Sequence, residues 1–267
     1  MNILSKLNEV TINNTNRIAE TDSKFCENQY EQYVAARDAL QQALNIIKPA
    51  YEEEKKSVDN SLDYCYLNKY QDIAPIEKRL EEIKEDFISK VVRHFSRQYK
   101  VTLDTEVINK KYDLYLTHKD IIAEIFEQMG GFNFKEKAVH ELIEASKATI
   151  YNFGKVSIKK TSLSITDFVR WDSWGWDGLR ISWDSKKESS LFTALSHFEN
   201  GDVKMLDSLF NMYKGMEKGS KHYNIFSKYE FDCEKFKSIK IFKNGKITIE
   251  FKNQTLAQEF ANTYLKK

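Results

Sequence analysis

The segment His140–Glu144, which reads His-Glu-Leu-Ile-Glu, is the part of the chain nearest to a known catalytic pattern. A zinc-protease helix needs two histidines one turn apart and a glutamate that acts as general base. Here Glu144 stands where the second histidine is required, and the sequence positions no further ligand. We therefore expect His140 and Glu144 to lie on a solvated helix face and to bind no metal.

Other groupings of reactive side chains are equally incomplete. The remaining histidines are scattered, and His94 lies beside Arg93 and Arg97, which indicates only a small basic patch. No serine or cysteine sits in a nucleophile elbow, and no glycine-rich phosphate loop follows a strand. The sequence predicts a protein that is not an enzyme, has no catalytic residues and uses no cofactor.

All four tryptophans lie in one run, Phe-Val-Arg-Trp-Asp-Ser-Trp-Gly-Trp-Asp-Gly-Leu-Arg-Ile-Ser-Trp-Asp, from Phe168 to Asp184. Tryptophan and arginine are the residue types that most often dominate binding interfaces, and they also stack on bases. The alternative is a twisted strand–turn–strand whose tryptophans cover a core. The interleaved aspartates disfavour phosphate, so a protein partner is preferred to nucleic acid here. The candidate partner-binding residues are Arg170, Trp171, Trp174, Trp176 and Arg180.

Neighbouring residues of a strand point to opposite faces, so the tryptophans of this run cannot all face one core. Trp174 and Trp176 share one parity, whereas Trp171 and Trp183 share the other, and Gly175 permits a bend. We expect at least one tryptophan, Trp174 in particular, to be exposed.

The segment Lys237–Phe251 predicts a β-hairpin. A two-residue Asn-Gly turn would place Ile239 opposite Glu250, which mixes the faces of the two strands. A three-residue loop, residues 243–245, instead pairs Phe242 with Lys246 and puts Ile239 and the other isoleucines on one face. We therefore predict this register, with Gly245 at positive φ in a bulge.

Four lysines of this hairpin form the candidate nucleic-acid-binding set: Lys237, Lys240, Lys243 and Lys246. Lysine side chains neutralise phosphates, and binding of this kind weakens steeply with salt. Lysines at a sheet edge or turn also keep a protein soluble without binding anything, and this alternative stays open.

The elements that position these residues begin with long helices. Apolar residues recur at three- and four-residue spacing over 22–62, where Pro49 is expected to kink or divide the helix, and again from Pro75 to about Tyr99. The two stretches predict an antiparallel helical hairpin or arm, through which a homodimer is also conceivable. Further helices are expected near 118–129, 134–150, 186–198, 203–214 and 255–265, with caps at Thr117, Asn133 and Ser185 and ends at Gly130, Gly201 and Gly215.

Alternating apolar residues from Lys155 onward predict antiparallel strands. The fold class is therefore α+β, with a helical region over 1–100 and an α+β body over 101–267. The chain has 267 residues and a net charge of +1, but residues 204–267 hold 13 Lys against 7 Asp and Glu. Three separated cysteines and the lack of a long apolar run predict a cytoplasmic protein without disulfides or membrane segments.

Over roughly residues 62–265 the chain resembles a phage- and plasmid-borne family catalogued as domain of unknown function 4942. The resemblance rests on the helix 134–150, the tryptophan run, the helix end Phe198–Asp202 and the segment Phe242–Phe251. Members of that family often accompany or are fused to adenine DNA methyltransferases. The glycine-rich cofactor loop and the DPPY-like tetrapeptide of such enzymes are both missing here, so methylation by this chain alone is not expected.

What the resemblance implies is a mobile-element setting, in which accessory proteins often counter host restriction or CRISPR systems. We therefore expect a phage or mobile-element accessory protein that binds a macromolecule and inhibits a host defence complex. The alternatives are a nucleic-acid-binding module that uses the lysine-rich C-terminal segment, and an enzyme of unrecognised type.

Overall fold

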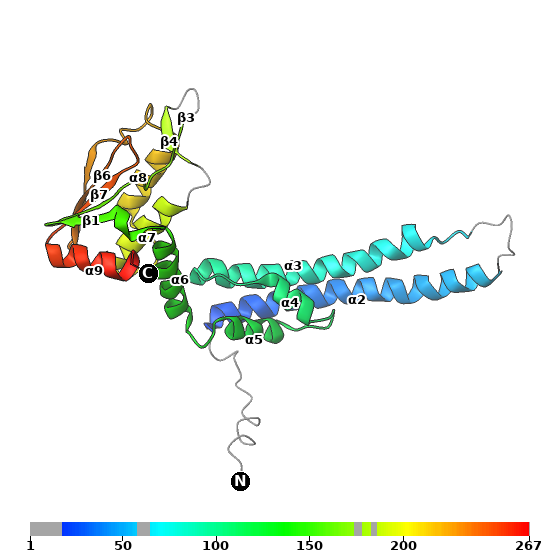
Figure 1. Ribbon diagram of the computed structural model, residues 1–267. Helices are drawn as coiled ribbons and strands as arrows, with labels where there is room; N and C mark the ends of the chain where they lie inside the picture. Colours follow the sequence, from blue (N-terminus) through cyan, green and yellow to red (C-terminus); the bar gives the residue numbers. More distant parts are fainter. Residues whose placement is uncertain (1–17, 58–64, 174–177, 183–185, 267) are drawn as a thin grey trace, which may run out of the picture. The chain divides into compact units, whose positions relative to one another are not determined.

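The structure, a computed structural model, describes residues 18–57, 65–173, 178–182 and 186–266. The chain forms two compact units, Met1–Phe134 and Lys135–Lys267, called here the helical unit and the sheet unit (Figure 1). The predicted α+β fold class is confirmed. No helix among the described residues combines the length and apolar character needed to cross a bilayer.

The helical unit is built on two long helices, α2 (Glu20–Ser57) and α3 (Ala74–Tyr99), which run antiparallel along each other (Figure 1). This is the predicted helical hairpin. Pro75 lies in the first turn of α3, as expected. Pro49 does not divide α2, because apolar side chains on both sides of it, Leu44 and Tyr51, pack in the same core and offset the hydrogen bond that a proline removes.

Two short helices complete this unit, α4 (Thr105–Lys111) and α5 (His118–Gln128). The predicted capping box is present, since Thr117 and Asp120 each bond the other's backbone N–H. Gly130 and Gly131 end the helix at positive φ. Ile108 and Ile121 are buried in the same core as α2 and α3. The unit boundary therefore follows Phe134 instead of lying near residue 100.

The sheet unit begins with α6 (Phe134–Ala148), of which Phe134 itself packs in the helical unit. Its five-stranded antiparallel sheet has the order β1-β2-β7-β6-β5, and a separate two-stranded sheet pairs β3 with β4. The strands are β1 (Val156–Lys159), β2 (Ser162–Ile165), β3 (Trp171–Ser173), β4 (Leu179–Ile181), β5 (Lys228–Glu230), β6 (Phe236–Ile241) and β7 (Ile247–Phe251). Short helical turns occur at Lys69–Ile73 (η2) and Phe153–Lys155 (η3).

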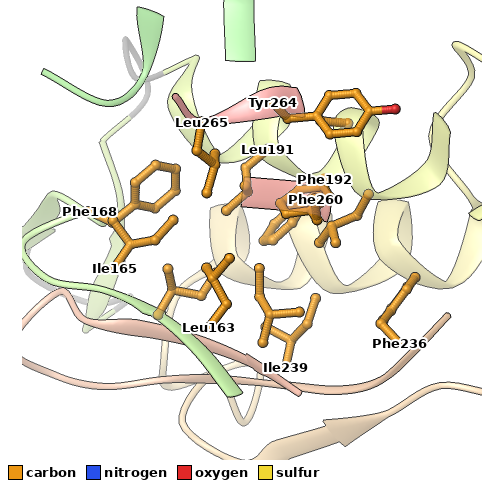
Figure 2. Packing of buried hydrophobic residues seen from close by; sticks show 14 of the residues in the cluster. Leu163, Ile165, Phe168, Leu191, Phe192, Phe236, Ile239, Phe260, Tyr264 and Leu265 are labelled. Carbon is orange, nitrogen blue, oxygen red and sulfur yellow. The ribbon is translucent and has the colours of Figure 1, made fainter. Parts of the chain in front are cut away.

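Three helices belong to the same unit: α7 (Lys187–Asn200), α8 (Asp207–Lys218) and α9 (Gln254–Tyr264). Figure 2 shows strand residues such as Leu163 and Ile239 pointing toward Phe192 of α7 and Phe260 of α9. One face of the sheet is therefore covered by helices.

The predicted helix end at Gly215 is wrong. Helix α8 begins at Asp207 and continues past Gly215, which lies inside the helix because the ring of Tyr223 occupies the space of a side chain there. Ser185 lies outside the described residues, and α7 is capped by Lys186 without a side-chain hydrogen bond. Gly201 does end α7 in the left-handed conformation, as predicted.

The hairpin of β6 and β7 has the predicted register. Ile239 pairs with Ile249 and Ile241 with Ile247. The Phe242 N–H donates to the Lys246 carbonyl oxygen at 2.9 Å, which closes a three-residue loop. All four isoleucines are fully buried, so hydrophobic matching across the strands decides the turn type.

Gly245 is required in this loop for two reasons. Its φ is +76°, and a Cβ at this position would lie 2.5 Å from the carbonyl oxygen of Val169. The Gly245 carbonyl oxygen also accepts the N–H groups of Phe168 and Val169, both at 2.9 Å. The loop is thus clamped to the segment that leads into β3.

Gly245→Ala should lower the free energy of unfolding of the sheet unit by about 2 to 4 kcal/mol, from backbone strain and overpacking together. Gly201→Ala is the matched control, because φ is +75° but nothing lies within 4 Å, and it should cost about 1 kcal/mol. Urea unfolding followed by tryptophan fluorescence reports this unit alone, since all four tryptophans lie in it. Equal losses of unfolding free energy for the two variants would contradict a close approach between residue 245 and the Val169 carbonyl oxygen.

His197 of α7 and Tyr264 of α9 are joined by a 2.6 Å contact between His197 Nδ1 and the tyrosine hydroxyl. Burial lowers the pKa of His197 and raises that of Tyr264 to about 12. The neutral imidazole is therefore favoured, with Nδ1 accepting from the hydroxyl.

Because folding lowers the pKa of His197 below the ordinary value of 6.5, its contribution to stability is present above pH 6.5 and is lost as pH falls. His197→Asn keeps an acceptor near the Nδ1 position but does not titrate. Between pH 7 and about pH 5 the variant should lose less unfolding free energy than the wild type. If urea titrations give the variant and the wild type the same change of unfolding free energy with pH, His197 does not contribute to the pH dependence of stability.

Candidate functional site

The five-stranded sheet has a second face, opposite the helices, that carries polar side chains. Strand alternation places Ser157, Ser164, Thr248, Lys240 and Lys228 there, and each is the direct cross-strand neighbour of the next. Ser157, Lys240 and Lys228 are exposed, while Ser164 and Thr248 are half-buried and share a 2.9 Å hydrogen bond. We call this surface the open face.

Three of the four candidate lysines belong to the open face. The Nζ atoms of Lys240 and Lys246 both lie over the half-buried ring of Phe242, 5.2 and 5.4 Å from its centroid. Lys237, at the bulge of β6, contributes to the positive charge around Glu250. Lys243 is separate, because it lies in the turn with its Nζ 5.7 Å from the ring of Phe226.

The carboxylates of the open face neutralise only part of this charge. Glu250 pairs with Lys228 at 3.1 Å, and hydrogen bonds from Lys228 and Ser238 hold the pKa of Glu250 below its ordinary value. Lys240 and Lys246 form no ion pair with any described residue. Lys240 also stands directly opposite Lys228, but the charge of Lys228 is offset by its ion pair with Glu250.

The tryptophan run forms a strand pair in its described part. Trp171 pairs with Ile181 and Asp172 with Arg180. Trp171 is half-buried, and its ring packs edge-on to Phe226 with centroids 5.4 Å apart. Arg170 is exposed and Arg180 is half-buried. The predictions for Trp174, Trp176 and Trp183 fall on residues outside the described part of the chain.

The structure brings the two predicted sites into contact. Lys243 lies over Phe226, and Phe226 packs on Trp171. The backbone bonds from Phe168 and Val169 to Gly245 hold the tryptophan run against the hairpin loop. Sequence reasoning did not find Phe226 or Phe242, although an aromatic residue directly before a lysine-rich turn is a recognisable feature at Phe242.

A buried polar cluster in the helical unit was also missed. Asp22 of α2 contacts His94 Nε2 of α3 at 2.7 Å and accepts a hydrogen bond from the Tyr99 hydroxyl. Burial, together with Asp22, raises the pKa of Tyr99 to about 12 and that of Cys26, one turn along α2, also to about 12. The thiol therefore stays protonated, and the cluster joins α2 to α3 instead of supplying a nucleophile.

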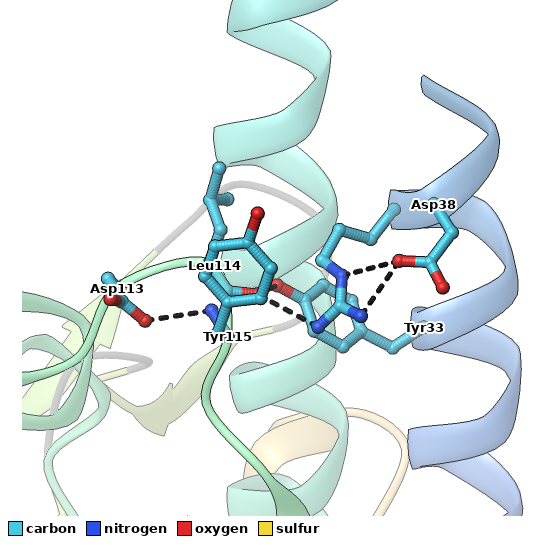
Figure 3. A network of polar contacts seen from close by, with 6 residues as sticks. Tyr33, Asp38, Asp113, Leu114 and Tyr115 are labelled. Atoms are coloured by element: carbon cyan, nitrogen blue, oxygen red, sulfur yellow. Dashed lines mark hydrogen bonds and ion pairs between the residues drawn. The ribbon is translucent and has the colours of Figure 1, made fainter. Parts of the chain in front are cut away.

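Arg37 of α2 is held in a similar way (Figure 3). Its Nε and Nη2 donate to Asp38 at 2.9 and 2.8 Å, and Nη1 reaches the Leu114 carbonyl oxygen at 3.4 Å. The Tyr33 hydroxyl donates to the same carbonyl at 2.6 Å. The guanidinium also lies 4.9 Å from the ring centroid of Tyr115. With these contacts made, Arg37 fixes the loop after α4 and is not available for phosphate.

His140 and Glu144 do not form a metal site with their neighbours. His140 is exposed, and Glu144 pairs with Lys147 at 3.3 Å. Within the described ranges, no group of three His, Cys, Asp or Glu side chains is placed to hold a metal ion. A cavity of about 350 Å³ lies in the helical unit between α3 and α4, but neither histidine nor cysteine lines it.

Because Trp171 packs on Phe226, Trp171→Ala should lower the unfolding free energy of the sheet unit by about 2 to 4 kcal/mol. Tyr151→Ala provides the control, since this tyrosine is 98% exposed and its truncation should change stability by less than about 0.5 kcal/mol. Urea unfolding followed by circular dichroism measures both. A Trp171 variant as stable as the control would mean that this tryptophan is free to bind a partner.

Neither a family model, nor a curated protein, nor a solved structure matches this chain. The resemblance to the phage- and plasmid-borne family therefore stays a prediction.

Proposed function

We propose that this protein acts by binding a macromolecule, and that its sheet unit binds nucleic acid on the open face. The observation that carries the proposal is the arrangement of Lys240 and Lys246, which lie over Phe242 without a carboxylate partner among the described residues. Ammonium groups of this kind are available for phosphates.

The charge distribution supports this assignment. The chain as a whole has a net charge of only +1. The sheet unit, however, holds 23 Lys and Arg against 17 Asp and Glu, a net of +6, whereas the helical unit holds 18 against 23, a net of −5. Attraction to phosphate is therefore a local property of the sheet unit, and the acidic helical unit would not share it.

A protein partner remains a second proposal, favoured by the surface next to the open face. Exposed Arg170 adjoins Trp171, and Lys243 lies over Phe226, which gives the combination of arginine and aromatic residues found at interface centres. A host defence complex of the kind that the family resemblance implies would be bound through these residues.

The nucleic-acid proposal predicts that Lys240→Glu with Lys246→Glu removes most binding to a 20-nucleotide fluorescent oligonucleotide. Lys187→Glu with Lys218→Glu makes the same change in net charge on helices α7 and α8, outside the open face, and should reduce binding far less. Anisotropy titrations at several salt concentrations measure both.

For the wild type, log K against log salt concentration should fall with a slope of about −0.7 per phosphate neutralised, and the Lys240/Lys246 variant should have a slope smaller by about 1.4. The absence of binding to single- or double-stranded oligonucleotides at low salt would contradict the proposal. Equal losses for the two double variants would indicate attraction to the unit's net charge instead of a site on the open face.

A further inference from the structure

Phe242 is the aromatic residue that distinguishes the open face from an ordinary basic surface. It follows β6 directly, and its N–H bond to the Lys246 carbonyl oxygen makes these two residues the last cross-strand pair before the turn. Strand alternation puts Phe242 on the same side as Lys240, and the cation–π contact between them agrees with that placement. Phe242 is half-buried, so part of this residue is accessible to solvent.

From this geometry we infer that the open face binds single-stranded nucleic acid, with a base stacked on Phe242 and the flanking phosphates bound by Lys240 and Lys246. The inference rests on the proposed function and adds the class of ligand. Both ammonium groups lie over this ring in the free protein. Phosphates on either side of a base would draw the two lysines outward and uncover a ring face on which that base can stack. Bases inside a duplex are already stacked and paired, so a ring on a flat sheet cannot reach their faces.

The row of polar side chains gives the strand a path away from the ring. Lys240 is followed across the sheet by Thr248, Ser164 and Ser157, each the direct neighbour of the one before. Four strands separated by about 4.8 Å give a path of about 14 Å from β6 to β1. Hydroxyl groups both donate and accept, so they can bond to base edges of any type. The face therefore favours single strands without selecting one sequence.

The side chains on this path are short. Because serine and threonine extend little beyond the sheet, a nucleic-acid strand can approach the protein backbone closely. Lys159 lies on β1 two residues after Ser157, opposite Ser162 and therefore beside the row, where it is exposed and has no ion pair with a described residue. Its ammonium group adds positive charge near this end of the path, which suits a ligand that carries phosphates along its length.

The test is the pair Phe242→Leu and Phe242→Tyr, titrated against a fluorescent oligo(dT) of 20 nucleotides and against a duplex of the same length. Leucine keeps the apolar bulk but cannot stack, and it should weaken single-strand binding about 5- to 150-fold, the range found when one stacked base loses its aromatic partner. The salt slope should not change, because the same phosphates are still neutralised. Tyrosine should restore binding, and duplex affinity should be unaffected by either variant.

The outcomes separate this inference from the proposed function. If Phe242→Leu binds oligo(dT) as tightly as the wild type while Lys240→Glu with Lys246→Glu does not bind, stacking is wrong and nucleic-acid binding stands. If the wild type binds neither oligonucleotide at low salt, both are wrong. Equal affinity of the wild type for the single strand and the duplex also overturns the inference. Urea unfolding followed by tryptophan fluorescence is the folding control, and the leucine and tyrosine variants should unfold at the same midpoint. With equal midpoints, weaker binding by the leucine variant reflects the lost ring and not a loss of folding.

Discussion

The sheet unit depends on one close approach, that of the Gly245 loop to Val169. The glycine carbonyl oxygen accepts two backbone N–H groups there, and only a residue without a Cβ leaves room for the Val169 carbonyl oxygen. This contact holds the three-residue loop against the segment before β3, in the register that the buried isoleucines of β6 and β7 select. A slip of one residue would turn the isoleucines of one strand toward solvent and its polar side chains toward the core. Both the core and the open face therefore depend on this register.

A sheet that is covered by helices on one face alone can use the other face for binding. The buried face of this sheet is occupied by isoleucine, leucine and phenylalanine against α7 and α9. Its open face needs no apolar residues for folding, and most of its side chains are serine, threonine or lysine. Lys240 and Lys246, by contrast, lie over Phe242 on this face and have no carboxylate partner among the described residues.

The helical unit uses its charged residues in a different way. Asp22 bonds to both His94 and Tyr99, and Arg37 bonds to Asp38 and to a backbone carbonyl. Such groups are costly to bury unless they are paired, and here each is paired with a residue of the same unit. They hold the helices and the following loop in place, and for that reason they are not candidates for chemistry. On the open face of the sheet unit, Lys240 and Lys246 differ from these groups because neither has a carboxylate partner among the described residues.

Several features of this protein were determined by the sequence alone, because they depend on residues close together in the chain. The hairpin register follows from alternation around residues 243–245, and the start of α5 follows from the reciprocal bonds of Thr117 and Asp120. Contacts between distant residues were decided only by tertiary structure. Asp22 meets His94 because α3 folds back along α2, and Gly215 stays inside α8 because Tyr223 packs against it. Periodicity shows which face of an element is apolar, but the element that covers that face is selected by packing of the whole chain. The same reason explains why Lys243 separates from Lys240 and Lys246: the turn directs it to Phe226, a residue that no local pattern connects with the hairpin.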